Sequence, residues 1–108
     1  MTVTKLCELC SLEAINMADG EREVDGVYCC DLLSWVMGKA NGNDAWITIM
    51  SNINVIAVAQ LTDISCVILA EGVTLDDDAF KTAQQKGINV LSSKQSVYSL
   101  CLSLGKVL

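Results

Sequence analysis

The chain has no histidine among its 108 residues. Nucleophilic serine and cysteine residues usually need a histidine base, so Ser-His-Asp and Cys-His catalysis are excluded, as are histidine metal sites and histidine pH switches. Only seven residues are basic against thirteen acidic ones, and the basic residues are scattered. Because nucleic acids and anionic membrane surfaces require clustered positive charge, we expect neither as a partner of this chain.

Proline is also absent, and no apolar run approaches the ~18–20 residues of a membrane span. The first residues lack the pattern of a signal peptide, so we expect a cytoplasmic protein. A length of 108 residues predicts one domain over residues 1–108. The apolar fraction of 52% is a little high, and we expect the excess apolar surface to form an oligomer interface.

The clearest structural pattern lies in the middle of the chain. Residues 46–50 and 66–70 are apolar runs of strand length, and residues 53–61 between them carry only two polar side chains. Ser51 and Asn52 are good N-cap residues for this intervening helix. Two buried strands joined through a helix predict a parallel pair. The apolar helix is expected to be buried, either under neighbouring elements or against a second subunit.

Strand and helix patterns alternate along the rest of the chain. Further strands are expected at residues 13–17, 27–30 and 88–91, and further helices at residues 2–10, 32–40, 74–86 and 95–108. Asp31 is the expected N-cap of the second helix, and Thr74 with Asp77 resembles a capping box. This alternation predicts an α/β fold with a mostly parallel sheet and helices on both faces.

Ligands of such sheets bind beyond the carboxyl ends of the strands. Polar residues follow several of the expected strands at this edge, so we expect a pocket there. The expected ligand-binding residues are Asp31, Thr48, Ser51, Asn52, Asn54, Glu71, Gly72, Thr74 and Ser92. For Asp31, a plain capping role is the competing interpretation. No serine or threonine has a recognisable base, so the sequence shows no catalytic set and we do not expect an enzyme.

Six cysteines are the most conspicuous feature of the composition. Cys7 and Cys10 have the spacing of a metal or redox pair, and Cys29 and Cys30 are adjacent, so four thiolates are available for zinc or an iron–sulfur cluster. However, the first pair lies in a helix pattern, and adjacent strand residues point to opposite faces. We therefore interpret the cysteines as structural thiols without a metal, and keep a metal or redox accessory protein as the alternative.

Several segments together resemble the small DRTGG-domain proteins. The run from Gly26 to Met37 (GVYCCDLLSWVM) is similar to a glycine-started "D-L-L-S" segment of that family. Further matches are the "W-I-T" strand at residues 46–48, the "N-V-I-A-V-A" helix at residues 54–59, and residues 68–72 and 83–91. Two residues depart from the family pattern: Trp35 replaces an acidic residue, and Glu71 replaces a small or polar one.

The resemblance implies a three-layer α/β/α fold like the N-terminal domain of HPr kinase/phosphorylase. It also implies kinship with accessory domains found beside CBS modules, which are generally non-catalytic, regulatory or ligand-sensing, and often oligomeric. We therefore expect a homodimer that joins through residues 53–61 or 32–40 and binds a small metabolite or nucleotide. A module that binds only a protein partner, without a small ligand, is a further alternative. Free-standing members accompany redox and iron-hydrogenase genes, which implies a redox or hydrogenase-associated protein partner. No particular cofactor is implied.

Overall fold

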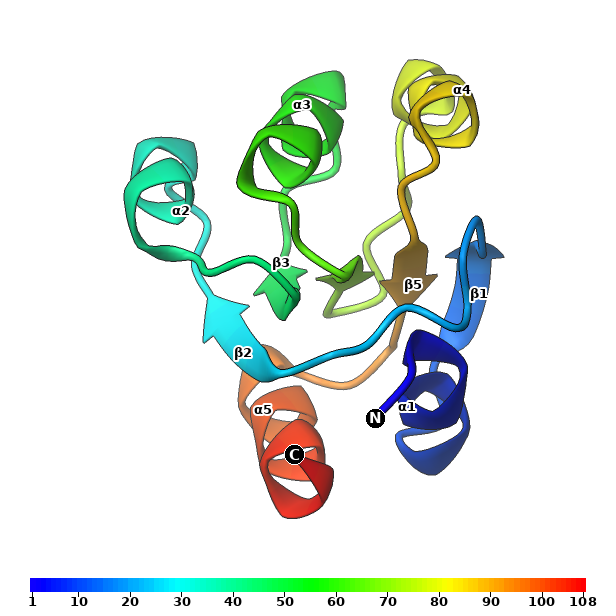
Figure 1. The fold of residues 1–108 in the computed structure, drawn as a ribbon, viewed down its shortest axis with the longest axis vertical. Helices are drawn as coiled ribbons and strands as arrows, with labels where there is room; N and C mark the ends of the chain where they lie inside the picture. Colours follow the sequence, from blue (N-terminus) through cyan, green and yellow to red (C-terminus); the bar gives the residue numbers. More distant parts are fainter.

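The computed structural model describes all 108 residues as five helices and five strands around one sheet (Figure 1). In chain order the elements are α1 (Val3–Leu9), β1 (Glu13–Asn16), β2 (Gly26–Cys29), α2 (Leu33–Lys39), β3 (Asp44–Thr48), α3 (Ile53–Thr62), β4 (Cys66–Leu69), α4 (Asp77–Lys86), β5 (Val90–Ser92) and α5 (Val97–Val107). The strand order is β1-β5-β4-β3-β2, and all neighbours are parallel except β1 and β5. The predicted α/β class with a mostly parallel sheet is confirmed.

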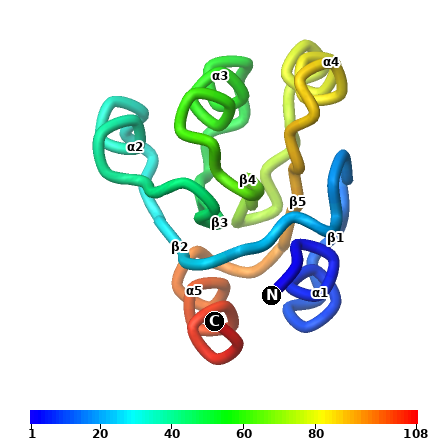
Figure 2. Tube along the Cα trace, in the orientation of Figure 1, coloured from blue at the N-terminus to red at the C-terminus, as the bar shows by residue number.

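The fold has three layers. Helices α2, α3 and α4 cover one face of the sheet, and α1 and α5 cover the other (Figures 1 and 2). Along β3, Ala45 and Ile47 belong to the apolar cluster under α1 and α5, whereas Trp46 belongs to the cluster under α2, α3 and α4. Because successive strand residues point to opposite faces, a strand covered on both sides must be apolar throughout. This explains why the middle of β3, Ala45 to Ile47, and the whole of β4 are apolar in the sequence.

Helix α3 is buried on one side only. Its buried residues are Val55, Ile56, Val58 and Ala59. The opposite side is mixed: Ile53 and Leu61 are exposed there, Leu61 by 73%, together with the polar side chains of Asn54 and Gln60. The prediction that the helix packs under neighbouring elements is therefore met for one side, and the other side presents apolar side chains to solvent. None of the five helices has the length and apolar character needed to cross a membrane.

Two predicted helix caps are wrong. The N-cap of α2 is Leu32, and Asp31 instead accepts hydrogen bonds from the Thr48 hydroxyl (2.8 Å) and the Ile49 N–H (3.0 Å). These donors lie at the end of the neighbouring strand, which the local sequence around Asp31 does not show. Likewise, α4 begins at Asp77 with Asp76 as its N-cap, so Thr74 stays in the preceding loop. The acidic first turn of α4 remains suited to the helix dipole.

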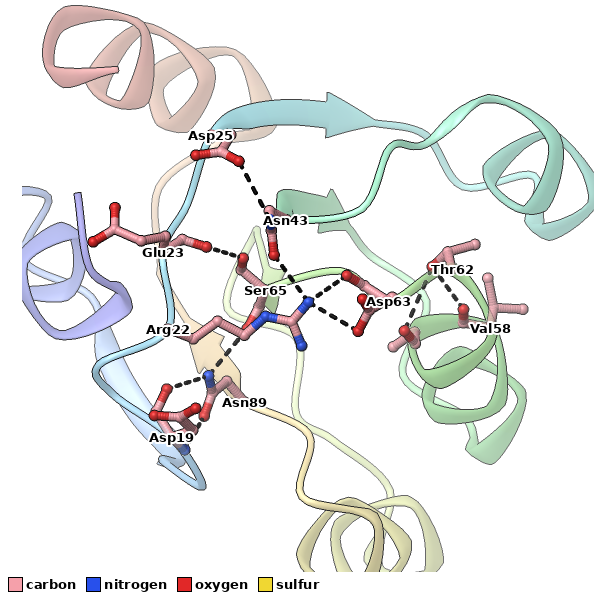
Figure 3. Close-up of polar contacts among 11 residues, drawn as sticks. Asp19, Arg22, Glu23, Asp25, Asn43, Val58, Thr62, Asp63, Ser65 and Asn89 are labelled. Atoms are coloured by element: carbon pink, nitrogen blue, oxygen red, sulfur yellow. Dashed lines mark hydrogen bonds and ion pairs between the residues drawn. The ribbon is translucent and has the colours of Figure 1, made fainter.

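The segment between β1 and β2, residues 17–25, crosses the amino end of the sheet from one edge to the other (Figure 1). Asn89 at the start of β5 holds its first part (Figure 3). The Asn89 side chain accepts from the Asp19 N–H (2.8 Å) and donates to the carbonyls of Asp19 (2.8 Å) and Ser65 (3.0 Å). We call residues 17–25 the strap, because they cover this end of the sheet.

The middle of the strap is held by charge and by hydroxyl contacts. Arg22 donates to the Asp63 carboxylate (2.9 Å) and to the Asn43 side chain (3.1 Å) (Figure 3). The Ser65 hydroxyl donates to the carbonyl of Glu23. The strap therefore closes the amino end of the sheet, and the loops at the carboxyl end are the ones free to form a site.

Candidate functional site

A cavity of about 680 Å³ lies at the carboxyl ends of β4 and β5. Pockets for small molecules have volumes of roughly 300–1,000 Å³, so this one is large enough for a metabolite. Two segments line it, the loop Gly72–Leu75 after β4, and Ser92–Gln95, which begins with the last residue of β5 and continues into the loop after it. The remaining lining residues are Ser11, Glu13 and Ile15 around the start of β1, and Asp77 and Phe80 of α4.

The topology explains why the pocket lies at β4 and β5. The chain leaves β4 toward α4 on one face of the sheet and leaves β5 toward α5 on the other (Figure 1). Loops that depart to opposite faces leave a crevice between them, which is where open α/β sheets bind ligands. The chain leaves β2 and β3 toward α2 and α3, on the same face as α4, so no such crevice arises there.

The two loops are locked together by backbone hydrogen bonds. The N–H of Glu71 donates to the Gln95 carbonyl (2.8 Å), and the N–H of Gly72 donates to the Ser93 carbonyl (3.0 Å). Both Glu71 and Gly72 have left-handed backbones, with φ of 62° and 71°. Such a conformation is costly for a non-glycine residue, and it persists where surrounding bonds hold it. The pocket is therefore built on a fixed frame.

The pocket carries few charges. Glu13 and Asp77 contribute carboxylates and Lys94 contributes an ammonium group, and none of the three belongs to an ion pair. Ser11, Thr74, Ser92 and Ser93 supply hydroxyls, while the apolar part of the lining comes from Ile15, Val73, Leu75 and Phe80. The lining thus combines an apolar portion with hydroxyls and unpaired charges, a composition typical of small-molecule sites.

Four of the predicted ligand residues lie in or beside this pocket. Gly72, Thr74 and Ser92 line it. Glu71 precedes Gly72 in the same loop, but its carboxylate accepts a hydrogen bond from the Val97 N–H (3.0 Å). This places a negative charge at the amino end of α5, which is a favourable interaction with the helix dipole. Glu71 therefore supports the pocket from outside.

The other five predicted residues gather at the ends of β2 and β3 and the start of α3, and none lines the pocket. They are Asp31, Thr48, Ser51, Asn52 and Asn54. Most of them already have partners within the chain. The Thr48 hydroxyl donates to Asp31, the Ser51 hydroxyl donates to Asp76 (3.3 Å), and the Asn52 side chain caps α3. Asn54 is exposed on the first turn of α3.

Sequence reasoning missed several lining residues. Glu13 reaches the pocket because β1 pairs antiparallel with β5, which puts Glu13 opposite Ser92. No local pattern in the sequence shows this pairing. Phe80 was detectable, because it follows Asp77 by three residues and therefore shares its side of a helix. Lys94 and Gln95 extend the loop that begins at Ser92, and the same reasoning about strand ends applies to them.

The cysteines do not gather into one site. All six are free thiols, and no group of three or more Cys, His, Asp or Glu side chains is placed to hold a metal ion. Burial, followed by the neighbouring Cys101 thiol, raises the pKa of Cys29 to about 11, and burial raises the pKa of Cys66 to about 12. Burial also raises the pKa of Cys7 and Cys10. Raised pKa values disfavour the thiolate, which is the form that binds metals and attacks disulfides.

No protein-family model matches the chain, and no curated protein matches it in sequence. A solved structure is similar to it: the CBS and DRTGG domains of the regulatory region of Clostridium perfringens pyrophosphatase, complexed with its activator, diadenosine tetraphosphate. The TM-score is 0.73 over 95% of this chain, at 14% sequence identity. The chain covers 45% of the length of that structure.

At this sequence identity the similarity concerns the fold. The fold is shared with part of a regulatory region that contains CBS and DRTGG domains. The resemblance to DRTGG-domain proteins, carried by the run between Gly26 and Met37 and the helix at residues 54–59, is therefore supported at the level of the fold.

Proposed function

We propose that this chain is a non-catalytic regulatory module of the DRTGG family that binds a small metabolite or nucleotide in the pocket at the ends of β4 and β5. The observation that carries the proposal is the pocket itself, which lies where the connections from β4 and β5 diverge. We also propose that residues 1–108 form one domain, since two apolar clusters share a single sheet.

The chemistry of the pocket favours binding over catalysis. A hydroxyl nucleophile needs a base within hydrogen-bonding distance. No hydrogen bond joins a hydroxyl of the pocket to Glu13 or Asp77, and the Ser93 hydroxyl accepts from the Gln95 N–H instead (3.1 Å). The similar solved structure adds support, because it is a regulatory region complexed with a nucleotide activator.

A thermal-shift screen with metabolites and nucleotides tests this proposal. A ligand at 100 times its dissociation constant stabilises a protein by about 2.7 kcal/mol, and each kcal/mol raises Tm by roughly 4–8 °C in a domain of this size. Thr74→Trp, which introduces an indole into the exposed loop of the pocket, should abolish the shift. Asn54→Ala, outside the pocket, should keep it. A wild-type chain that no compound stabilises, or a Thr74→Trp chain that responds normally, would contradict the proposal.

We further propose that the chain forms a homodimer through the exposed apolar side chains of α2 and α3. Trp35 and Met37 on α2 and Ile53 and Leu61 on α3 are all exposed, and the two helices contact each other. Exposed apolar side chains of this size on two neighbouring helices favour an interface with another chain. In a two-fold dimer each of these residues is buried once in each subunit, so its contribution to the interface counts twice.

Sedimentation velocity tests the dimer. Burying one leucine contributes about 1.5–3 kcal/mol, so Leu61→Glu should weaken a two-fold dimer by roughly 100-fold or more, with each 1.4 kcal/mol equal to a factor of ten. Tyr98→Glu is the matched control, because Tyr98 is equally exposed but lies on α5, on the other face of the sheet. A monomeric wild-type chain at all concentrations, or equal effects of the two variants, would count against this interface.

A further inference from the structure

We infer that the pocket recognises a planar aromatic ring joined to a vicinal diol, as in a nucleoside, and disfavours a polyphosphate chain. The inference rests on the proposed function, because it names the class of ligand for the same pocket. It follows from how charge, hydroxyls and apolar side chains are distributed around the pocket.

Two facing walls of the pocket have the same arrangement. On β1, Glu13 is exposed and Ile15 is partly buried. On α4, Asp77 is exposed and Phe80, three residues later, is partly buried. Helix α4 contacts β1, so the two walls face each other. The pocket therefore has an acidic rim and an apolar interior.

The interior suits a flat ring. Phe80 offers an aromatic side chain that a second ring can contact in an offset or edge-on arrangement. Ile15 and Leu75 add aliphatic surface, and Leu75 is only 7% exposed. A heterocyclic base would bury apolar surface in this interior while its polar substituents reach the hydroxyls of Ser92 and Ser93.

The rim suits hydroxyl donors. An ionised carboxylate only accepts hydrogen bonds, and a pair of neighbouring hydroxyls can donate to both of its oxygens. An acidic residue that binds the ribose hydroxyls is a recurrent feature of nucleotide sites in α/β folds. Glu13 and Asp77 are free for this role, since neither belongs to an ion pair and neither carboxylate accepts a hydrogen bond within the chain.

A polyphosphate would find little to bind. Phosphate sites in α/β folds use free backbone N–H groups and basic side chains. Here the N–H groups of Glu71 and Gly72 already donate to Gln95 and Ser93, and Lys94 is the single cation against two carboxylates. Asp77, in the first turn of α4, also offsets the positive end of the helix dipole where it meets the pocket. Lys94 can pair with one phosphate group, and further phosphates of a chain would have no cation to pair with.

Titration calorimetry with purified chain tests the inference. The panel is adenosine, guanosine, cytidine and uridine, with AMP, ATP and the 2′-deoxy form of whichever nucleoside binds best. We expect the nucleoside to bind at least tenfold more tightly than the triphosphate, and the deoxynucleoside to bind about tenfold more weakly than the nucleoside. Asp77→Asn should weaken nucleoside binding about tenfold and reduce the ratio of nucleoside affinity to triphosphate affinity. Asp78→Asn removes the same charge one residue away, outside the pocket lining. It should change neither the affinity for the nucleoside nor the ratio of nucleoside affinity to triphosphate affinity.

The outcomes separate the two proposals. Triphosphate binding that exceeds nucleoside binding, equal binding of the deoxynucleoside, or equal effects of Asp77→Asn and Asp78→Asn would overturn the ligand class. The ligand class would also be overturned if no nucleoside binds but another compound does, and Thr74→Trp abolishes the binding of that compound. In that case the proposed function of the pocket would still stand. Only a screen in which nothing binds, or in which Thr74→Trp has no effect, removes the proposed function as well.

Discussion

Replacing Trp46 with alanine should lower the free energy of unfolding by about 3–5 kcal/mol, the usual cost of truncating a buried tryptophan. Domains of this size have a total stability of roughly 5–15 kcal/mol. The variant should therefore lose a large share of its stability, and at the lower end of that range it would be only marginally folded at room temperature. Urea denaturation followed by far-UV circular dichroism measures this loss.

The expected cost follows from where Trp46 lies. The residue is fully buried in β3, the strand between β2 and β4, and belongs to the apolar cluster under α2, α3 and α4. Its indole N–H also donates to the carbonyl of Cys30 (2.9 Å), which ties the end of β2 to β3. Truncation removes the ring, leaves a cavity and leaves the Cys30 carbonyl without this donor.

A phenylalanine control separates these contributions. Trp46→Phe keeps much of the ring and loses the hydrogen bond, so it should cost about 1–3 kcal/mol, the range for leaving one buried polar group unpaired together with a small loss of packing. The exposed Trp35 remains as the single tryptophan in both variants. A loss below about 1 kcal/mol for Trp46→Ala would show that the cluster collapses around the gap, contrary to a rigidly packed sheet.

The sheet itself was predictable because its signal is local. Residues 46–50, apart from Thr48, and residues 66–70 are apolar at successive positions, and such runs occur where both faces of a strand are covered. The parallel pairing of β3 and β4 then follows from the intervening helix. The caps were less predictable: Asp31 meets its partners on β3, seventeen residues away, and only the tertiary structure brings them together.

The location of the pocket depended on information that local sequence does not carry. Every parallel strand end was a candidate, so Asp31 and Thr48 ranked equally with Gly72 and Ser92. What distinguishes β4 and β5 is that α5 lies on the opposite face from α4, together with the antiparallel addition of β1 beside β5. Both depend on how the two ends of the chain pack. Glu13 is therefore a residue of the pocket that only the fold reveals.

Replacing Asn89 with alanine should lower the free energy of unfolding by about 3 kcal/mol, since three hydrogen bonds are lost at about 1 kcal/mol each. The Asn89 side chain is 3% exposed. It bonds both the N–H and the carbonyl of Asp19 in the strap and the carbonyl of Ser65 beside β4 (Figure 3). Without it, the Asp19 N–H and the Ser65 carbonyl lose their side-chain partner, and the strap loses its anchor beside β5.

Asn16→Ala is the matched control for this variant. Asn16 is also an asparagine that bonds backbone from β1, but it makes one hydrogen bond, to the Ile88 carbonyl (2.9 Å), and is only partly buried. Its loss should cost about 1 kcal/mol. Urea denaturation of both variants checks the difference, and equal losses would mean that the strap does not depend on Asn89. Because the strap closes the amino end of the sheet and the pocket lies at the carboxyl end, Asn89→Ala should leave ligand affinity unchanged at temperatures where the chain stays folded.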